Sequence, residues 1–361
     1  MATLDRYLKV VVEHGASDLH YCSGCKPILR KDGGLVGLRE DPIDPETAHR
    51  VLVEIMPEKN IEEYRETNDT DFAYEIPGVA RFRVNIYRDL KGPCGSFRVI
   101  PADILTCEQL GLPKSVKQFC GLSKGLVLVT GPTGSGKSTT LAALIDHINT
   151  TRSDHIVTIE DPVEFVHPNK RCLINQREVN THTTGFKKAL RAALREDPDI
   201  VLVGEMRDLE TTHIAIETAE TGHLVFGTLH TTTAISTVDR LIDQFPSEQQ
   251  AQIRVMLSTS LKGIVAQNLL KKKGGGRIAA LEVLVVNNAV ASLIREGKTT
   301  QIMSIMQTGK KEGMTLLNEE LTRMVKADIV EPDEAYLKAV DKDGLIGQFQ
   351  TAGITFQPPA E

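Results

Sequence analysis

Short apolar and polar stretches follow one another through the first hundred residues. Apolar residues recur at intervals of three and four over residues 4–14, which predicts an amphipathic helix there. From residue 17 to about 100, short extended runs are broken by turns, and helical patterns interrupt them at about 45–56 and 59–67. The pattern predicts a small α+β domain over residues 1–100, followed by a linker over 101–112.

The pattern changes after residue 112, where continuous apolar runs alternate with helical stretches. Four runs of buried-strand type lie at residues 125–129, 156–159, 200–203 and 224–226. Such runs are typical of parallel strands that helices cover on both faces, so residues 113–287 are expected to form an α/β core. From about residue 247 we expect mostly helix apart from a strand at 278–285, which leaves a helical region over 288–361.

Composition indicates an ordinary globular protein. Of its 361 residues, 41% are hydrophobic and 25% charged, which excludes a wholly disordered, collagen-like or coiled-coil chain. The formal net charge of -6 argues against a protein that binds nucleic acid mainly by electrostatics. No apolar run approaches the ~18 residues of a membrane span, and the N-terminus lacks a secretory signal pattern, so we expect a cytoplasmic protein without membrane insertion.

A phosphate-binding motif follows the first apolar run of the second part. Residues 131–138 read Gly-Pro-Thr-Gly-Ser-Gly-Lys-Ser and lie between a predicted strand and a predicted helix, as the P-loop pattern requires. The glycines let backbone N–H groups surround phosphates, Lys137 reaches the β and γ oxygens, and Ser138 offers its hydroxyl to Mg²⁺. The expected nucleotide-binding residues of the loop are Thr133, Gly134, Ser135, Gly136, Lys137, Ser138 and Thr139.

Acidic residues follow two of the predicted strands. Glu160 and Glu164 come after the run 156–159, and Glu205 comes after the next run, in the Walker B position. Open α/β sheets build their sites at the carboxyl ends of parallel strands, so we expect one acid to polarise the attacking water and another to hold a metal-bound water. The alternative is that strand-end acids merely cap the helices that follow.

Two histidines bracket a further predicted strand within residues 221–231. His223 and His230 are an odd number of residues apart, so they would face opposite sides of an unbroken strand, which disfavours a shared metal. Each has either a structural role or a phosphate-sensing role beside the nucleotide.

One predicted strand of the first domain presents arginines on a single face. Arg81 and Arg83 alternate with Phe82 and Val84, so the apolar side chains face one way and the guanidinium groups the other. The arginines either form a solvated face or act as arginine fingers toward a γ-phosphate held by another domain or subunit. Arg98 on the following strand could join them.

The motifs together resemble those of one family, the hexameric ATPases of bacterial type II secretion and type IV pili. Four boxes stand in the order of that family, namely a P-loop at 131–138, an aspartate box at 158–164, a Walker B box at 190–208 and a histidine box at 223–230. Two segments of the first domain, 16–20 and 81–85, match as well, so the resemblance covers essentially the whole chain.

Within this family the chain most resembles the twitching-motility retraction ATPases. Only a short domain precedes the motor, and the tetracysteine zinc insert of assembly ATPases is absent from the sequence. Residues 289–296, Ala-Val-Ala-Ser-Leu-Ile-Arg-Glu, match the retraction signature Ala-Ile-Arg-Asn-Leu-Ile-Arg-Glu in part and depart from it at residues 290–292.

The resemblance implies a PAS-like first domain, a RecA-like P-loop ATPase core and a homohexameric ring. The ring would dock on an inner-membrane pilus platform protein, associate peripherally with that membrane and act indirectly on pilin.

The resemblance also implies roles for single residues. Lys137 and Ser138 would bind ATP and Mg²⁺, Glu164 would be the general base, and Glu205 would act at the metal or its water. The implied metal set is Ser138, Glu160 and Glu205, partly through water. Arg81 and Arg83 would reach across a subunit boundary, and His223 and His230 would couple the nucleotide state to that boundary.

The sequence therefore predicts a Mg²⁺-dependent ATPase that pulls pilin subunits out of a pilus. The alternatives are a pilus-assembly or type II secretion ATPase of the same family, a nucleic-acid motor on the same core, and a small-molecule kinase. The negative net charge disfavours the nucleic-acid motor, and the lack of a recognisable acceptor-binding lid disfavours the kinase.

Overall fold

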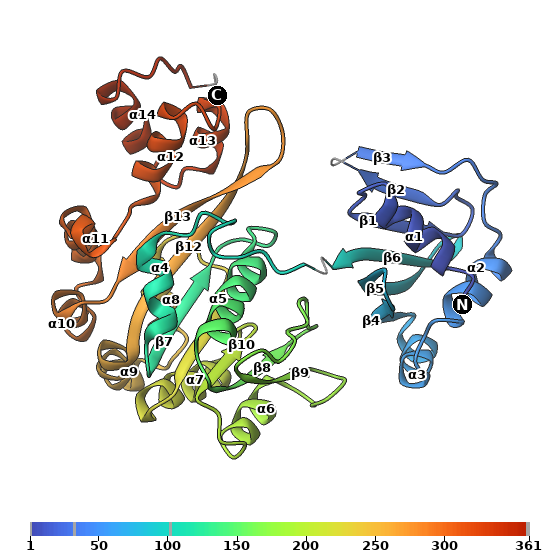
Figure 1. Ribbon diagram of the computed structural model, residues 1–361, viewed down its shortest axis with the longest axis horizontal. Helices are drawn as coiled ribbons and strands as arrows, with labels where there is room; N and C mark the ends of the chain where they lie inside the picture. Colours follow the sequence, from blue (N-terminus) through green and yellow to red (C-terminus); the bar gives the residue numbers. More distant parts are fainter. Residues whose placement is uncertain (1, 32–33, 101–102, 359–361) are drawn as a thin grey trace. The chain divides into compact units, whose positions relative to one another are not determined.

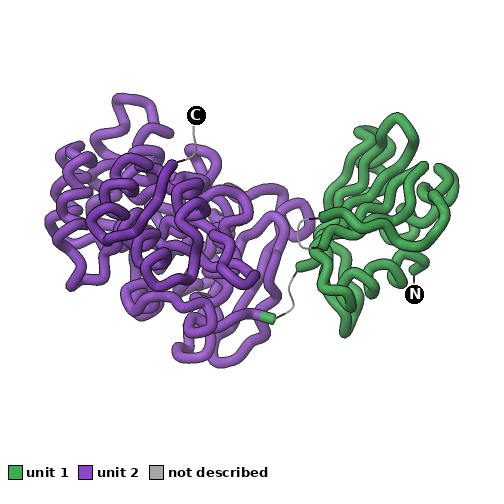
Figure 2. The backbone as a smooth tube through the Cα atoms, turned by 90° about the horizontal axis from the view of Figure 1, so that it is seen from above, with its two compact units in different colours: residues 1–103 green, residues 104–361 purple. Residues whose placement is uncertain are grey.

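The computed structural model describes residues 2–31, 34–100 and 103–358. The chain forms two compact units, residues 1–103 and 104–361, which Figure 2 colours separately. Residues 101–102 of the expected linker lie outside the described residues, whereas Cys107 and Leu112 from its later part are buried in the second unit. Among the described residues, no helix has the length and apolar character needed to cross a bilayer.

The first unit is an antiparallel sheet with helices packed on one face. Its helices are α1 (Asp5–Glu13), α2 (Pro45–Val53) and α3 (Glu58–Thr67), and its strands are β1 (Asp18–Cys22), β2 (Ile28–Lys31), β3 (Gly34–Gly37), β4 (Asp69–Ile76), β5 (Ala80–Asp89) and β6 (Gly92–Ile100). The six strands lie in the order β3-β2-β1-β6-β5-β4. The amphipathic helix expected at residues 4–14 is α1, whose buried residues Leu8 and Val11 pack in one cluster with Phe82 and Val84 of β5.

The second unit is built on a mostly parallel sheet (Figure 1). Its strands are β7 (Gly125–Thr130), β8 (His155–Glu160), β9 (Leu173–Glu178), β10 (Ile200–Val203), β11 (Leu224–Leu229), β12 (Leu261–Lys271) and β13 (Arg277–Val285). The seven strands lie in the order β13-β12-β7-β11-β10-β8-β9, and only β13 runs antiparallel to its neighbour. The expected α/β core is therefore confirmed.

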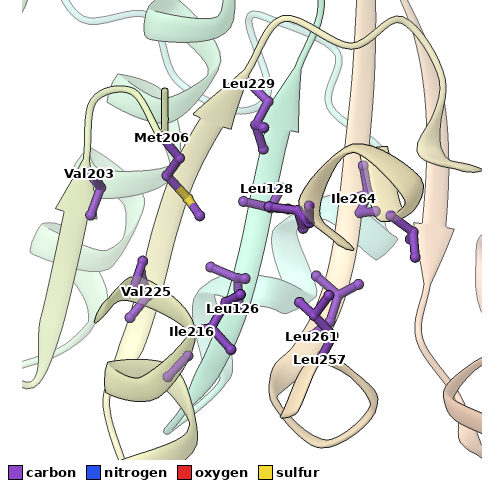
Figure 3. Close-up of a cluster of buried hydrophobic side chains, with 14 of the residues drawn as sticks. Leu126, Leu128, Val203, Met206, Ile216, Val225, Leu229, Leu257, Leu261 and Ile264 are labelled. Carbon is purple, nitrogen blue, oxygen red and sulfur yellow. The ribbon is translucent and has the colours of Figure 1, made fainter. Parts of the chain in front are cut away.

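Helices cover both faces of this sheet. They are α4 (Lys114–Gln118), α5 (Lys137–Thr151), α6 (Phe186–Ala193), α7 (Leu209–Thr221), α8 (Ala234–Asp243) and α9 (Ser247–Ser260). Leu126 and Leu128 of β7 belong to the cluster shown in Figure 3, which also holds buried residues of α6 to α9. The alternate residues Val127 and Val129 pack with α4 and α5 on the other face. Because burying each such side chain stabilises the fold by roughly 1.5–3 kcal/mol, both layers hold the strand ends in place.

Two strands of the second unit were missed by the sequence pattern. We expected residues beyond about 247 to be helical apart from 278–285, but residues 261–271 form β12, which pairs with β7 and β13. Gln267 and Asn268 are buried in this strand and interrupt its apolar run, which hid the strand signal. The edge strand β9 was missed because Asn175 to Glu178 are polar.

The chain ends in the expected helical region. Its helices are α10 (Asn288–Glu296), α11 (Ile302–Thr308), α12 (Leu317–Lys326), α13 (Pro332–Lys338) and α14 (Lys342–Thr351). A separate cluster holds buried residues of α12 to α14 together with Leu270 of β12 and Ala280 of β13. Glu282 of β13 adds polar contacts, because its carboxylate accepts hydrogen bonds from the backbone N–H groups of Ala234 (2.7 Å) and Leu317 (3.2 Å).

Candidate functional site

The loop between β7 and α5 has the backbone that the P-loop pattern predicts. β7 ends at Thr130 and α5 begins at Lys137. Gly131 and Gly136 have φ values of 142° and 89°, in a region that residues with a Cβ rarely adopt. At Gly131 a Cβ would also lie 2.2 Å from the carbonyl oxygen of Gln267, so the loop fits only with glycine at this position.

Lys137 brings a positive charge to this loop. Its Nζ donates hydrogen bonds to the carbonyl oxygens of Gly131 (2.8 Å) and Pro132 (3.2 Å). Burial lowers the pKa of Lys137, and the negative charges of Glu205 and Glu164 oppose that shift. The ammonium group therefore lies within electrostatic reach of two of the acids singled out from the sequence.

The remaining loop residues offer hydrogen-bond donors to a phosphate-bearing ligand. Thr133 and Gly134 are exposed, whereas Ser138 and Thr139 lie half-buried in the first turn of α5. The hydroxyl of Ser135 is buried and has no hydrogen-bond partner among the described residues. Because α5 has no side-chain cap, its first N–H groups are available for an anion. These features fit a nucleotide phosphate.

Glu160 is the last residue of β8. Its Oε1 accepts hydrogen bonds from the Thr158 hydroxyl (2.7 Å) and from Nε2 of Gln176 (3.3 Å). Burial raises the pKa of Glu160 to about 7, against these hydrogen bonds, and the charge of nearby Glu164 raises it further. Because β10 pairs with β8 in parallel, Glu205 follows the adjacent strand end at the same edge.

Glu205 forms the centre of a charged cluster. One carboxylate oxygen, Oε1, lies 2.5 Å from Nε of Arg207 and 2.7 Å from Nε2 of His230. Burial acts to raise the pKa of Glu205, but Arg207 and His230 outweigh it and lower the pKa below its ordinary value. The carboxylate is therefore held in its charged form.

The helix-cap alternative for the strand-end acids applies to a different residue. Asp208 is the N-cap of α7 and accepts a hydrogen bond from the backbone N–H of Thr211 (2.8 Å). Glu205 contacts His230 instead of capping a helix. The helix that follows β9, α6, has Gly185 and not an acid as its N-cap.

The two histidines lie at opposite ends of β11. His230 follows the strand and its side chain is 47% exposed beside Glu205. His223 precedes the strand, and its Nδ1 lies 3.2 Å from the carbonyl oxygen of Thr218 in α7. A strand of six residues separates them by about 20 Å, so the structure does not bring His223 to the P-loop of the same chain.

A hollow of about 520 Å³ adjoins Glu205. It is lined by Glu205, Met206, Arg207, Leu229, His230, Thr231, Arg240 and Gln244. Arg207 and Arg240 were not expected here: Arg207 follows the strand-end acid Glu205 by two residues, whereas Arg240 lies within α8 and no local pattern marks it.

The arginines of the first unit lie on one sheet face, as predicted. Phe82 and Val84 are fully buried, whereas Arg81 is half-buried and Arg83 exposed. Arg83 pairs in register with Arg98 of β6, and Nε of Arg98 donates to Oδ1 of Asp18 (2.9 Å) in β1. These contacts are all within the first unit.

The oxygen atoms in the first turn of α5 and at the strand ends suit a hard cation. Ser138, Glu160 and Glu205 offer hydroxyl and carboxylate oxygens, which Mg²⁺ prefers. Within the part of the chain that the structure describes, no three His, Cys, Asp or Glu side chains are grouped to hold a metal ion. A donor set of one hydroxyl and two carboxylates fits a cation that is bound largely through nucleotide phosphates and water.

Known proteins match the chain through both units. A family model described as type II/IV secretion system protein matches residues 1–336. The type IV pilus retraction ATPase PilT of Pseudomonas aeruginosa PAO1 is 51% identical over 327 residues, which cover 91% of this chain and 95% of that protein. A twitching motility protein of Neisseria gonorrhoeae is 47% identical over 322 residues, covering 89% and 86% of the two chains. The crystal structure of the pilus retraction motor PilT with bound ADP matches with a TM-score of 0.89 at 45% identity, covering 96% of this chain and 99% of that chain.

Proposed function

The chain belongs to the type II/IV secretion system protein family, and from this premise we propose that it hydrolyses ATP to drive the retraction of type IV pili. Two relatives that match it at 51% and 47% identity are named for pilus retraction and for twitching motility. The observation that carries the proposal is the P-loop itself, in which Gly131 and Gly136 hold positive φ between β7 and α5 and the Lys137 ammonium lies against the carbonyl oxygens of the loop. An ATPase needs a cation for the phosphates, a base for water and an acid near the metal.

Lys137 has a direct route to a bound phosphate. It donates to two neutral carbonyl oxygens of its own loop, Gly131 and Pro132. Phosphate oxygens carry charge and accept stronger hydrogen bonds from an ammonium group, so Lys137 would turn toward them. The backbone N–H groups at the start of α5 and the buried Ser135 hydroxyl would contribute further donors.

Ser138, Glu160 and Glu205 would hold Mg²⁺, the serine directly and the acids partly through water. When bound, Mg²⁺ neutralises negative charge on the β and γ phosphates. His230 and Arg207 would keep the Glu205 carboxylate charged and oriented for this task. His230 also ties the end of β11 to the end of β10, so it could report the nucleotide state to the rest of the subunit.

Glu164 is our candidate for the general base that takes a proton from the attacking water. The support is that its charge acts on Lys137, the residue that would contact the β and γ phosphates. Glu160 is less suited, because Thr158 and Gln176 already donate to one of its oxygens.

The active form that we propose is a homohexamer. Arg81 and Arg83, with Arg98 beside them, would act on nucleotide held by a neighbouring subunit, and His223 would contact a subunit boundary. The support is the placement of these arginines on one face of a separate unit. Permanently charged guanidinium groups stabilise charge that develops on a transferred phosphoryl group.

We place this ring at the cytoplasmic side of the inner membrane, docked on a pilus platform protein and acting through it on pilin. The support is the relationship to the pilus retraction ATPase and to the twitching motility protein.

An ATPase assay on the purified chain tests the catalytic part of the proposal. The wild type should release phosphate from ATP in the presence of Mg²⁺ and without any acceptor molecule, and EDTA should stop the reaction. Lys137→Ala should be inactive, whereas Lys124→Ala, an exposed lysine at the other end of β7, should retain wild-type activity. Mass measurement with and without nucleotide tests for six copies. ADP formation that requires an added small-molecule acceptor and releases no free phosphate would contradict the ATPase assignment.

A further inference from the structure

Gln267 joins the P-loop to a neighbouring strand. This residue of β12 is 2% exposed. Its Nε2 donates a hydrogen bond to the carbonyl oxygen of Ser135 (2.6 Å), and its Oε1 accepts one from the hydroxyl of Thr140 (2.7 Å). The amide group therefore uses both of its ends, one on the loop and one on the first turns of α5.

The register of the sheet explains why this residue reaches the loop. β12 pairs in parallel with β7, and Ala266 lies opposite Thr130, the last residue before the P-loop. Gln267 is thus one residue beyond the paired strand end. The approach is close, since a Cβ on Gly136 would lie 2.8 Å from Nε2 of Gln267.

The contact fixes the orientation of one peptide group. In a planar trans peptide, the C=O of Ser135 and the N–H of Gly136 point in opposite directions. Because the carbonyl is held toward Gln267, the Gly136 N–H is aimed away from β12. A flip of this peptide would present the carbonyl oxygen in place of the N–H, and a carbonyl oxygen repels phosphate.

Gly136 by itself does not prevent such a flip. The rotation would change φ of Gly136, and glycine adopts positive and negative φ about equally well. Because glycine has no Cβ, nothing within Gly136 itself enforces its observed φ of 89°. The hydrogen bond from Gln267, which lies outside the loop, favours one orientation.

We propose that Gln267 is a positioning residue for nucleotide binding and ATP hydrolysis, which keeps the Ser135–Gly136 peptide oriented with its N–H toward the phosphates. The inference rests on the proposed ATPase function and deepens it. A purely structural role would change the stability of the fold and leave the affinity for phosphate unchanged. A positioning role changes the affinity for nucleotide in a folded protein.

Substitution by glutamate separates the two roles. In Gln267→Glu the side chain keeps its length, but the carboxylate cannot donate to the Ser135 carbonyl and repels it. When the introduced carboxyl is protonated, one donor returns. The affinity for a fluorescent ADP analogue, relative to wild type at each pH, should be about tenfold lower at pH 8 and should recover as the pH falls toward 6.

Two further variants complete the experiment. Gln267→Met has a similar length and no hydrogen-bonding group, so its affinity relative to wild type should fall about tenfold at every pH. Thr140→Val removes the partner at the other end of the amide and should lower affinity less, because the bond to Ser135 remains. Circular dichroism and the mass of the assembly report folding for each variant.

The outcomes distinguish this inference from the proposed function. A wild type that neither binds ADP nor hydrolyses ATP would contradict the proposed function itself. If the wild type does both, and the folded Gln267→Glu and Gln267→Met variants bind ADP with wild-type affinity, the proposed role of Gln267 is overturned. If the introduced carboxylate prevents folding, Gln267→Met decides alone, since a folded Met variant with unchanged affinity overturns the inference and one with reduced affinity supports it.

Discussion

The Nε2 atom of His230 lies 2.7 Å from Oε1 of Glu205, so the residue that follows β11 contacts the acid that follows β10. Arg207 approaches the same oxygen, with its Nε at 2.5 Å. A histidine side chain that is 47% exposed therefore holds a carboxylate that is only 18% exposed. The contact links the ends of these two neighbouring strands.

Replacing His230 should impair catalysis more than nucleotide binding. His230→Ala removes one of the two groups that lower the pKa of Glu205 and orient its carboxylate. We expect turnover to fall at least tenfold with little change in ADP affinity, because Lys137 and the loop remain intact. Steady-state ATPase rates and a binding titration check this. His49→Ala, on the exposed side of α2, is the control, and equal losses of turnover in the two variants would contradict the role of the His230 contact.

Glu164→Gln should leave ATP bound and uncleaved. The amide has nearly the same size but cannot accept a proton from water, so we expect turnover to fall by about 10²- to 10⁴-fold. Single-turnover measurement of bound radiolabelled ATP provides the readout, and Glu217→Gln on the exposed side of α7 is the control. Normal cleavage by the Glu164 variant would remove this residue as the base.

Mixing two inactive variants tests whether the arginines act between subunits. Arg83→Ala lacks a proposed finger, and Lys137→Ala lacks the phosphate-binding ammonium. In a mixed ring, some interfaces combine an intact Lys137 with an intact Arg83 from the neighbour, so part of the activity should return. No recovery in rings shown by mass to be mixed would favour the solvated-face interpretation of Arg83.

Acid should destabilise the second unit through His167. This residue, 9% exposed, lies between β8 and β9, and burial lowers its pKa to about 4 from the ordinary 6.5. Between pH 6.5 and 4, His167 binds a proton in the unfolded chain but not in the folded chain. The stability that neutral His167 contributes is therefore fully present above pH 6.5 and is lost as the pH drops toward 4. The loss amounts to about 3 kcal/mol at most.

The free energy of unfolding, measured by urea titration at several pH values, checks the contribution of His167. His167→Leu removes the titrating group, so the variant should lose less stability than wild type between pH 6.5 and 4.5. Parallel pH profiles for the two proteins would show that His167 does not contribute.

Contiguous motifs made much of the site predictable. The P-loop residues are adjacent in the sequence, and strand-end acids share one edge of the sheet because parallel strands end there, as Glu160 and Glu205 do. Gln267 was missed because it depends on β12, whose buried polar residues obscure the strand pattern. No local sequence pattern shows that a side chain 132 positions away donates a hydrogen bond to the Ser135 carbonyl. Pairing of this kind is set by the order of strands.

The histidines show a second limit of sequence patterns. Their odd spacing predicted opposite faces, but both residues lie outside the paired strand, one at each end of β11. What separates them is the length of the strand, and this depends on where pairing with β7 and β10 begins and ends.

The most direct test of the proposed retraction motor is pilus behaviour in cells whose own copy of this protein carries Lys137→Ala. The variant should lack the ammonium that binds phosphate while keeping the fold, so any change in pili reports on ATP use. Live imaging of labelled pili should show surplus surface pili that extend and do not retract, with normal retraction in cells carrying Lys124→Ala. Cells without pili would contradict retraction and indicate an assembly motor.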